Sequence, residues 1–305
     1  YTTLAEDAGS KAYYAFACDD SNVCSSSRSG TFLVDIQVPT ITTFAISPDS
    51  SVSPNWANNA SPSITVTWNV SDQGSSHLDR VEVYRALFVA GGNDSSKASC
   101  VWTQAGSAVA PLDKDNWNCD AICVDRIVDT PGSGTWWYGM HVWDKAQNET
   151  VEPTPPGVKK ALVDINEPNS QIQSPASSSW FSNDFNLDTL DEDLDSGLNA
   201  TQCQYKIIPY EDTNGDGIAD TERPSSGWLS RTCNAPPSVP VTSITVGLAD
   251  SCKYQAKRSC WVYARSKDMA GNWHTPTQPV DSVKLYNIDW TQPQPGKLYL
   301  TANEG

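Results

Sequence analysis

The fold of this chain is decided by the stretch Cys260-Trp-Val-Tyr-Ala-Arg-Ser-Lys-Asp268, which runs directly into Met269-Ala-Gly-Asn272. Aromatic and apolar residues alternate with polar ones, which is typical of a β-strand with one buried face, and the Asp, Gly and Asn that follow favour a tight turn. Similar stretches end at Asp19 and at Asp144. These aspartates lie 125 and 124 residues apart along the series, so the chain repeats itself about every 125 residues.

Two further features keep the same order and nearly the same spacing. A Val-Asp-Ile strand precedes a proline at 34–39 and at 163–168, and a related strand runs from Asn287 to Pro293. An Asp-led turn precedes a strand at Asp72 and again at Asp193. The expected organisation therefore has complete units at 39–166 and 167–290. Residues 1–38 would hold the C-terminal strands of a partial unit, and residues 291–305 would begin a further repeat or form a tail.

Each unit is expected to be all-β. Ile64–Val70, Val81–Tyr84 and Val241–Val246 alternate with period two and are rich in residues that suit a pleated, half-buried surface. Clusters of Pro, Gly, Ser and Asn separate such runs, and no stretch has a convincing helical pattern. About seven short strands in such a unit predict an antiparallel β-sandwich, with strand tryptophans such as Trp68, Trp136 and Trp261 in its core.

These motifs resemble a known family. The Asp-x-Asp-Ser-Gly-Leu turn at 193–198, the aromatic strand ending in Asp-x-Ala-Gly-Asn at 268–272 and the closing Val-Asp strand are similar to bacterial and archaeal Ig-like repeats of large extracellular surface proteins. The first unit departs from the pattern, with Gln147 at the position of Gly271. The resemblance implies tandem Ig-like sandwiches in an elongated array, display at the cell surface, and a role in adhesion or as a stalk.

The charge restricts the partners. The formal net charge is −16, and 27 Asp outnumber 9 Glu, which indicates turns rather than acidic helices. Such a surface repels nucleic acid and anionic membranes and favours cations. No apolar run approaches the roughly 18 residues of a membrane span. The expected partners are neighbouring Ig-like domains or subunits, as in a polymer, and a surface glycan or protein ligand.

The nine cysteines indicate disulfides in an exported protein, because none shows paired metal-ligand spacing and the three histidines stand alone. The odd count leaves at least one thiol over unless an intermolecular disulfide forms, and Cys100 is the first candidate. A bond from Cys100 to Cys119 or Cys123 is the alternative. The remaining candidates for disulfides are Cys18, Cys24, Cys119, Cys123, Cys203, Cys233, Cys252 and Cys260.

One loop has the spacing of a calcium site. Oxygen side chains stand at alternate positions of 212–220, and Gly217 permits the sharp turn. The loop resembles those of EF-hand, dockerin and thrombospondin-type repeats, but Arg223 replaces the final bidentate acid, a role that Glu222 could take. The alternative is a plain surface turn. The expected calcium ligands are Asp212, Asn214, Asp216, Ile218, Asp220 and Glu222.

A second calcium site is expected where one unit meets the next, because two loops of an Ig-like sandwich lie at the same end as the incoming linker. The residues that this geometry would bring together are Asp164, Asn166, Glu167, Asp193, Asp195, Asp268 and Asn272. For the first unit they would be Asp35, Asp72, Asp144 and Asn148. The alternative is that these side chains only hydrogen-bond the neighbouring backbone of their turns.

No enzyme motif was found. The chain has no nucleophile elbow, no Cys/His pair in a recognisable context and no phosphate-binding loop after a strand. We therefore expect a non-enzymatic stalk, fibre or filament segment of a prokaryotic cell-surface protein, stiffened by disulfides and calcium. One alternative is an adhesin or binding module that stacks glycans on the loop residues Trp117, Trp180, Trp228 and Trp273. Another is an accessory region of a secreted hydrolase.

Overall fold

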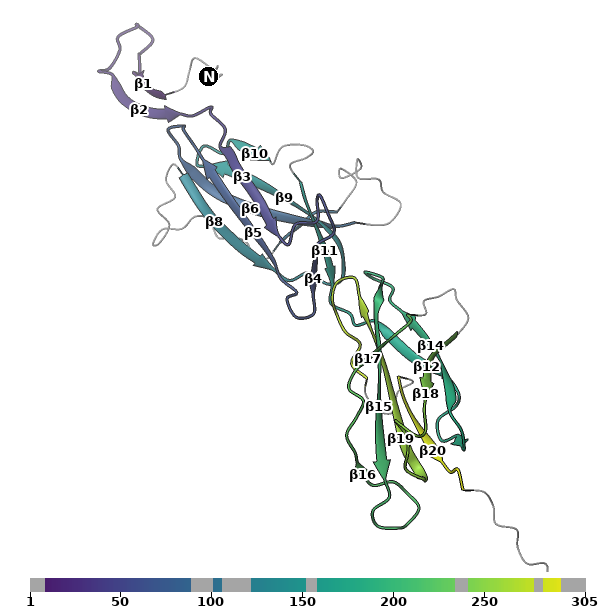
Figure 1. Ribbon diagram of the computed structural model, residues 1–305. Helices are drawn as coiled ribbons and strands as arrows, with labels where there is room; N and C mark the ends of the chain where they lie inside the picture. Colours follow the sequence, from purple (N-terminus) through teal and green to yellow (C-terminus); the bar gives the residue numbers. More distant parts are fainter. Residues whose placement is uncertain are drawn as a thin grey trace, which may run out of the picture. The chain divides into compact units, whose positions relative to one another are not determined.

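The computed structural model describes residues 9–88, 101–105, 122–151, 158–233, 241–276 and 282–291. Within these ranges the regular elements are all strands, so the expectation of an all-β chain of tandem sandwiches is confirmed (Figure 1). The chain divides into two compact units, Tyr1–Ile165 and Asn166–Gly305. Among the described residues, no helix has the length and apolar character needed to span a membrane.

The first described element is a hairpin of β1 (Gly9–Ala15) and β2 (Arg28–Val34), which pair antiparallel as a two-stranded sheet. A disulfide between Cys18 and Cys24 closes its connecting loop. Its aromatic and apolar side chains are largely exposed, with Tyr14 at 70% and Leu33 at 65%. The assignment of residues 1–38 to a partial sandwich domain stays a prediction.

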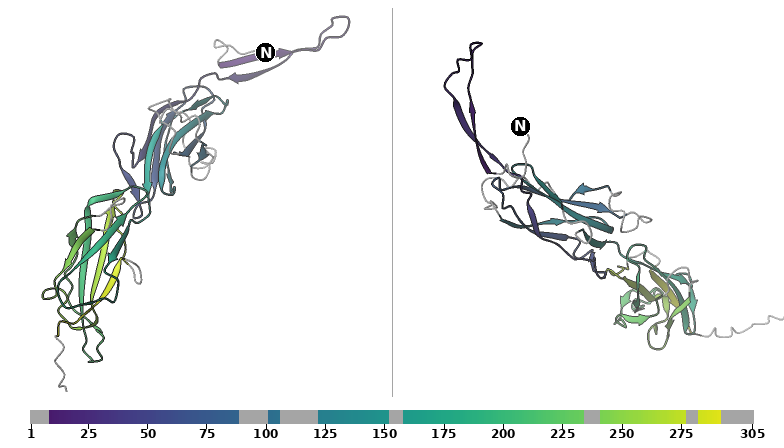
Figure 2. Two further views of the ribbon diagram at one scale, coloured as in Figure 1. Left: turned by 90° about the vertical axis from the view of Figure 1, so that its right-hand side faces the viewer. Right: turned by 90° about the horizontal axis from the view of Figure 1, so that it is seen from above.

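The first unit contains a sandwich of two sheets, which can be followed in Figures 1 and 2. One sheet has the order β3-β5-β8, and the other has the order β4-β11-β9-β6-β7, with β10 also paired to β9. The strands are β3 (Thr40–Ser47), β4 (Trp56–Asn58), β5 (Ile64–Ser71), β6 (Leu78–Leu87), β7 (Thr103–Gln104), β8 (Ile122–Asp129), β9 (Gly134–Asp144), β10 (Glu149–Val151) and β11 (Lys159–Asp164).

The core of the first unit follows from the alternation in the sequence. Along β5, Ile64, Val66, Trp68 and Val70 are all buried and face inward residues of β6 and β9 such as Val81 and Met140. Trp68 is a core residue as expected, and Trp136 packs against the same cluster. The buried apolar residues therefore come from both sheets, which is what holds a sandwich together.

The second unit repeats this architecture. Its sheets have the orders β12-β14-β18 and β13-β20-β19-β15-β16, with β17 also paired to β15. The strands are β12 (Asn169–Ser174), β13 (Trp180–Phe181), β14 (Phe185–Glu192), β15 (Leu198–Glu211), β16 (Thr221–Glu222), β17 (Leu229–Arg231), β18 (Val241–Val246), β19 (Ala256–Asp268) and β20 (Val283–Ile288).

Seven strand positions correspond between the units, because β3, β4, β5, β6, β8, β9 and β11 occupy the sheet positions of β12, β13, β14, β15, β18, β19 and β20. In both units the first strand breaks into two pieces that join different sheets. A cis peptide bond precedes a proline between those pieces, at Pro48 and at Pro175. The second piece pairs in parallel with the last strand of its unit.

One core expectation was wrong. Trp261 is half-buried on the outer face of β19, where its ring stacks on Tyr210 with centroids 4.7 Å apart. Its neighbours Cys260 and Val262 are the fully buried residues. Period-two alternation identifies two faces of a strand, and the aromatic side chain here belongs to the face away from the core.

Candidate metal centre

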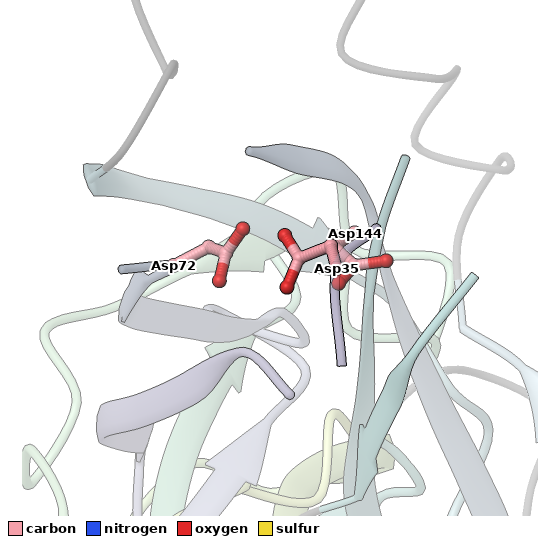
Figure 3. Close-up of side chains that lie close together, drawn as sticks. All are labelled: Asp35, Asp72 and Asp144. Carbon is pink, nitrogen blue, oxygen red and sulfur yellow. The ribbon is translucent and has the colours of Figure 1, made fainter. Parts of the chain in front are cut away.

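Three aspartates of the first unit converge although they are far apart in sequence. Asp35 follows β2, Asp72 follows β5, and Asp144 is the last residue of β9. Each offers a carboxylate oxygen, and these oxygens all lie within 4.8 Å of one another. Figure 3 shows the carboxylate of Asp72 directed toward the other two side chains. The loop positions of an Ig-like sandwich led to the expectation that these residues gather, and the structure brings them together.

The cluster is buried and strongly acidic. Asp72 is 1% exposed, Asp144 is fully buried, and Asp35 is half-buried. The ion pairs formed among the described residues do not reach any of the three carboxylates. Like charges this close repel one another, and burial strengthens the repulsion because the surrounding protein screens charge less than water does.

Asp72 is the least satisfied member of the cluster. Its Oδ1 accepts a hydrogen bond from the backbone N–H of Gly74 at 2.9 Å. Its Oδ2 is buried and has no hydrogen-bond partner among the described residues. A buried carboxylate oxygen without a donor is costly, so this atom calls for a positive partner.

Asp144 is fixed by the turn that follows it. Its two carboxylate oxygens accept hydrogen bonds from the backbone N–H and from the side-chain Nδ2 of Asn148, at 2.8 and 2.7 Å. The same Nδ2 donates to the backbone carbonyls of Asp35 and Gln37, at 3.1 and 3.2 Å. Asn148 therefore joins the turn after β9 to the segment after β2.

Asp35 is held equally firmly. Its Oδ2 accepts from the N–H of Ser76 at 2.7 Å, and its Oδ1 accepts from the N–H of Gln37 at 2.9 Å. Burial opposes ionisation, but the hydrogen bonds from Ser76, Gln37 and Ser75 outweigh it and lower the pKa of the Asp35 carboxyl. Gly74 leaves the space for this carboxylate, because a Cβ there would lie 2.2 Å from Asp35 Oδ2.

The donor set is chemically suited to a hard divalent cation. Carboxylate oxygens are the preferred ligands of Ca²⁺ and Mg²⁺, and each oxygen that accepts one hydrogen bond retains capacity for a metal.

The second unit contains the corresponding turn. Oxygens of Asp193 and Asp268 lie within 4.8 Å of each other. Asn272 donates from its N–H and its Nδ2 to the Asp268 carboxylate, both at 2.7 Å, and from Nδ2 to the carbonyl of Asn166 at 2.9 Å. The predicted junctional site also requires Asp164, which belongs to the first unit, so that site as a whole stays a prediction.

Two residues of the junctional set have other partners. Glu167 accepts hydrogen bonds from the N–H and Oγ1 of Thr275, at 2.8 and 3.0 Å. Asp195 accepts from Nδ2 of Asn166 at 2.5 Å and is exposed. These contacts join residues far apart in sequence, so they are not the local turn bonds of the alternative, and calcium binding by these two side chains stays a prediction.

The loop at 212–220 is exposed, and its side chains bind its own backbone. Asp212 accepts from the N–H groups of Gly215 and Gly217, both at 2.7 Å, and Asp216 accepts from the N–H of Ile218 at 2.8 Å. Asp220 accepts from Thr213.

The other expected ligands of this loop have protein partners too. Asn214 accepts from the N–H of Asp216 at 2.8 Å, and Glu222, on β16, accepts from the hydroxyl of Tyr210 at 3.1 Å. Carboxylates from three of these residues do not converge within 4.8 Å, in contrast to the Asp35, Asp72 and Asp144 group among the described residues. Calcium binding here therefore stays a prediction.

Disulfide-bonded cysteines occur in the β1–β2 hairpin, in the first sandwich and in the second unit. Besides Cys18–Cys24, the structure pairs Cys203 with Cys233 and Cys252 with Cys260. Cys123 is also disulfide-bonded. The sequence predicts that Cys100 is either the free thiol or bonded to Cys119 or Cys123. Cys100 and Cys119 lie outside the described residues, so the choice stays a prediction.

The tryptophans proposed for sugar stacking are largely engaged. The guanidinium of Arg265 lies between Trp228 and Trp273, 3.9 and 4.4 Å from their ring centroids. Lys206 and Lys267 approach the same two rings at 5.4 and 5.6 Å. Trp180 is 54% exposed, and Trp117 lies outside the described residues. Trp228 and Trp273 therefore each already have a cation over the ring, which competes with a sugar for that ring.

The sequence alone does not reveal Gly74 or the unsatisfied oxygen of Asp72 as parts of the acidic cluster. The available signal was the Asp72-Gln-Gly74 spacing, which favours a turn in which the aspartate accepts the N–H two residues later. That spacing predicts the local bond of Oδ1, but it cannot show where Oδ2 points.

Comparison with known proteins finds only distant structural similarity. No protein-family model matches the chain, and a search of curated proteins found no relative. Among solved structures, fibronectin(III)-like modules of CbhA from Clostridium thermocellum are 11% identical, with 82% of this chain and 93% of that chain covered and a TM-score of 0.27.

Two bacterial proteins give similar values. A 1.5-MDa bacterial ice-binding adhesin is 13% identical over 83% of this chain and 66% of that chain, with a TM-score of 0.30. A Ca²⁺-stabilised adhesin of an Antarctic bacterium is 13% identical over 92% and 57%, with a TM-score of 0.29. Similarity this low carries no argument about the function of this chain.

Proposed function

We propose that this chain is a non-enzymatic, extracellular structural segment in which tandem Ig-like sandwiches act as a spacer within a stalk, fibre or filament. The observation that carries the proposal is the repetition of one sandwich, with seven equivalent strands and the same Asp–Asn turn, in both units. Repeating one stable module adds length without adding a new site, which is the requirement of a spacer.

The disulfides support an extracellular place for this segment. Disulfides persist in oxidising compartments and typically stabilise a domain by about 2–4 kcal/mol by restricting its unfolded state. The bond between Cys203 and Cys233 links residues 30 apart, and it joins β15 to the segment after β17. Such a crosslink also limits how far the chain extends if the second unit opens.

The hairpin of β1 and β2 supports contact with a neighbouring domain or subunit. An isolated two-stranded sheet is marginally stable in water, and this one exposes Tyr13, Tyr14 and Phe16 by half or more. An adjacent sandwich domain or subunit of the same kind would cover these side chains and complete the sheet.

Calcium in the loop at 212–220 would stiffen the second unit. The oxygen spacing supports it, since a bound cation stabilises only the folded loop. Melting of the chain with calcium and with chelator tests the idea, using Asp216→Ala as the variant. We expect calcium to raise the melting temperature of the second unit in the wild type and not in the variant. If calcium left the melting temperature of the wild type unchanged, calcium binding by this loop would be contradicted.

The mechanical role is tested by stretching single molecules of the full chain in oxidising and reducing buffer. We expect one separate unfolding event for each unit. Reduction should lengthen the unfolded second unit by about 130 Å, because the 30 residues closed by Cys203–Cys233 and the 8 closed by Cys252–Cys260 become free to extend by about 3.3–3.6 Å each. A chain that extends smoothly, with no unfolding event at all, would contradict a role in bearing force.

A further inference from the structure

We propose that Asp35, Asp72 and Asp144 form a calcium site that fixes the segment after the β1–β2 hairpin to one end of the first sandwich. This site is distinct from the loop at 212–220, and it adds a metal to the unit in which the sequence shows no calcium-loop spacing. The three ligand oxygens come from different segments of the chain and lie within 4.8 Å of one another (Figure 3).

The unpartnered oxygen of Asp72 is the decisive observation. Turn formation accounts for Asp72 Oδ1, for both oxygens of Asp144 and for both oxygens of Asp35, because each accepts a backbone or amide N–H of a nearby turn. It does not account for Asp72 Oδ2, which is buried without a donor. This oxygen belongs to a side chain that is 1% exposed and is directed into the acidic cluster.

The charge of the cluster requires a compensating cation. Three carboxyl groups sit together without an ion pair from the described residues, and two of them are almost completely buried. A divalent ion would neutralise most of this charge and give Asp72 Oδ2 the partner that it lacks. A single protonated carboxyl would satisfy one contact but would leave the other two carboxylates facing each other without a cation.

Calcium fits this set better than magnesium does. The ligand oxygens are supplied by rigid turns, and several already accept a hydrogen bond, so their directions are fixed by the protein. Calcium tolerates irregular geometry and six to eight oxygens, whereas magnesium demands a near-ideal octahedron and keeps its waters. The half-exposed Asp35 leaves a side of the site open for water to complete the coordination.

The location gives the bound ion a structural effect. Asn148 donates to the carbonyls of Asp35 and Gln37, and Thr150 donates to the carbonyl of Pro39, so the segment after β2 already lies against the turn after β9. A cation shared by Asp35, Asp72 and Asp144 would lock that contact. Without the ion, the repulsion between the carboxylates would loosen it.

The test is calcium binding to the chelator-treated full chain, measured by isothermal titration calorimetry. Asp72→Asn keeps the shape of the side chain and the acceptor for Gly74, but it removes the charge. We expect this variant to lose one calcium per chain or to bind it at least tenfold more weakly, while Asp216→Asn retains that binding event. A matched control is Asp20→Asn, since Asp20 is an exposed turn aspartate of the same unit.

Stability in chelator separates a metal ligand from a turn residue. If the cluster is a cation site, Asp72→Asn relieves repulsion and leaves the metal-free protein as stable as the wild type or more stable. A residue needed only for its turn would lower stability with and without calcium. Circular dichroism confirms that the compared proteins are folded.

A second variant reaches the site without touching a ligand. Gly74→Ala places a methyl group 2.2 Å from Asp35 Oδ2 and must displace that carboxylate. We expect weaker calcium binding at this site with Asp72 intact. Equal calcium binding in the wild type and in both variants would overturn the site, and an equal response to magnesium at the same concentration would overturn its assignment to calcium.

Discussion

The turns at Asp144–Asn148 and Asp268–Asn272 are the clearest comparison between the two units. In each turn the backbone N–H of the aspartate donates to the asparagine carbonyl at 3.1 Å. The asparagine Nδ2 in turn donates to the aspartate carboxylate at 2.7 Å. The residue before the asparagine differs, with Gln147 at φ 69° and Gly271 at φ 99°. The hydrogen bonds therefore define the repeat, and glycine is one way to satisfy the backbone that they require.

The partner aspartates teach a different lesson. Asp193 Oδ2 accepts hydrogen bonds from the N–H of Gly197 at 2.5 Å and from Ser196 Oγ at 3.3 Å. Asp72 likewise accepts through one oxygen from its own loop, at the N–H of Gly74. The difference is burial, because Asp193 is half-buried while the second oxygen of Asp72 is buried without a donor. Units with the same strand order can therefore differ in how far their loops enclose an acidic side chain.

The largest expected effect concerns a buried ion pair found in the second unit. Arg231 donates to both oxygens of Asp191, at 2.5 and 2.7 Å, and both side chains are fully buried. Arg231→Met should lower the free energy of unfolding by about 3–5 kcal/mol, because it leaves a buried carboxylate unpaired. Urea unfolding of the full chain measures this loss.

Two further variants make that comparison specific. Adding Asp191→Leu should recover much of the loss, because it removes the orphaned charge. Arg85→Met in the first unit should cost less, since Arg85 is 26% exposed where it pairs with Asp129. Equal losses for Arg85→Met and Arg231→Met would show that burial does not set the difference between the units.

The next effect concerns the disulfide that joins β15 to the segment after β17. Replacing Cys203 and Cys233 together by serine should destabilise the second unit by about 2–4 kcal/mol, since the unfolded chain regains the freedom of a loop of 30 residues. Scanning calorimetry should show a lower melting temperature for the transition of that unit alone. A shift of the first unit by the same amount would mean that the two do not unfold independently.

A smaller effect should follow from exchanging the residue in the second turn. Gly271→Gln should cost about 1–2 kcal/mol, because φ 99° is strained for a residue with a Cβ. Gly271→Asn should cost less, since asparagine tolerates positive φ better than glutamine does. Chemical unfolding of the three proteins would contradict this explanation if glutamine and asparagine proved equivalent.

The reverse exchange should have the smallest effect. Gln147→Gly should stabilise the first unit by at most about 1 kcal/mol, because it relieves a left-handed backbone. It also removes contacts of the Gln147 side chain with Arg80 and Asp79, which are exposed and weak. A loss of stability on unfolding in urea would indicate that those contacts matter more than the backbone strain.

The sequence predicted the repeat and the fold class because both depend on patterns that survive without coordinates. The alternation at Ile64–Val70 corresponds to β5, and the Asp turns appear where the aromatic strands end. The face that each strand turns inward is less determined, and Trp261 shows why. The alternation along β19 defines two faces of the strand but not which of them faces the core. That choice depends on how β19 pairs with β15 and β20.

The candidate sites show the same division. Placing Asp35, Asp72 and Asp144 together required only the loop order of a sandwich, which the sequence supports. The free oxygen of Asp72 and the space that Gly74 leaves for Asp35 depend on side-chain direction, which sequence spacing does not contain. The loop at 212–220 is the converse case, because its spacing is suggestive while its carboxylates bind its own backbone.

The parallel pairing of β4 with β11, and of β13 with β20, has a consequence for how each unit resists tension. The chain comes in before the first strand and goes out after the last, and these two neighbours run in the same direction. Pulling on both ends slides one strand lengthwise past the other, so their hydrogen bonds are loaded together in shear. An antiparallel hairpin pulled at its open end would instead lose its hydrogen bonds in sequence, each carrying the load alone.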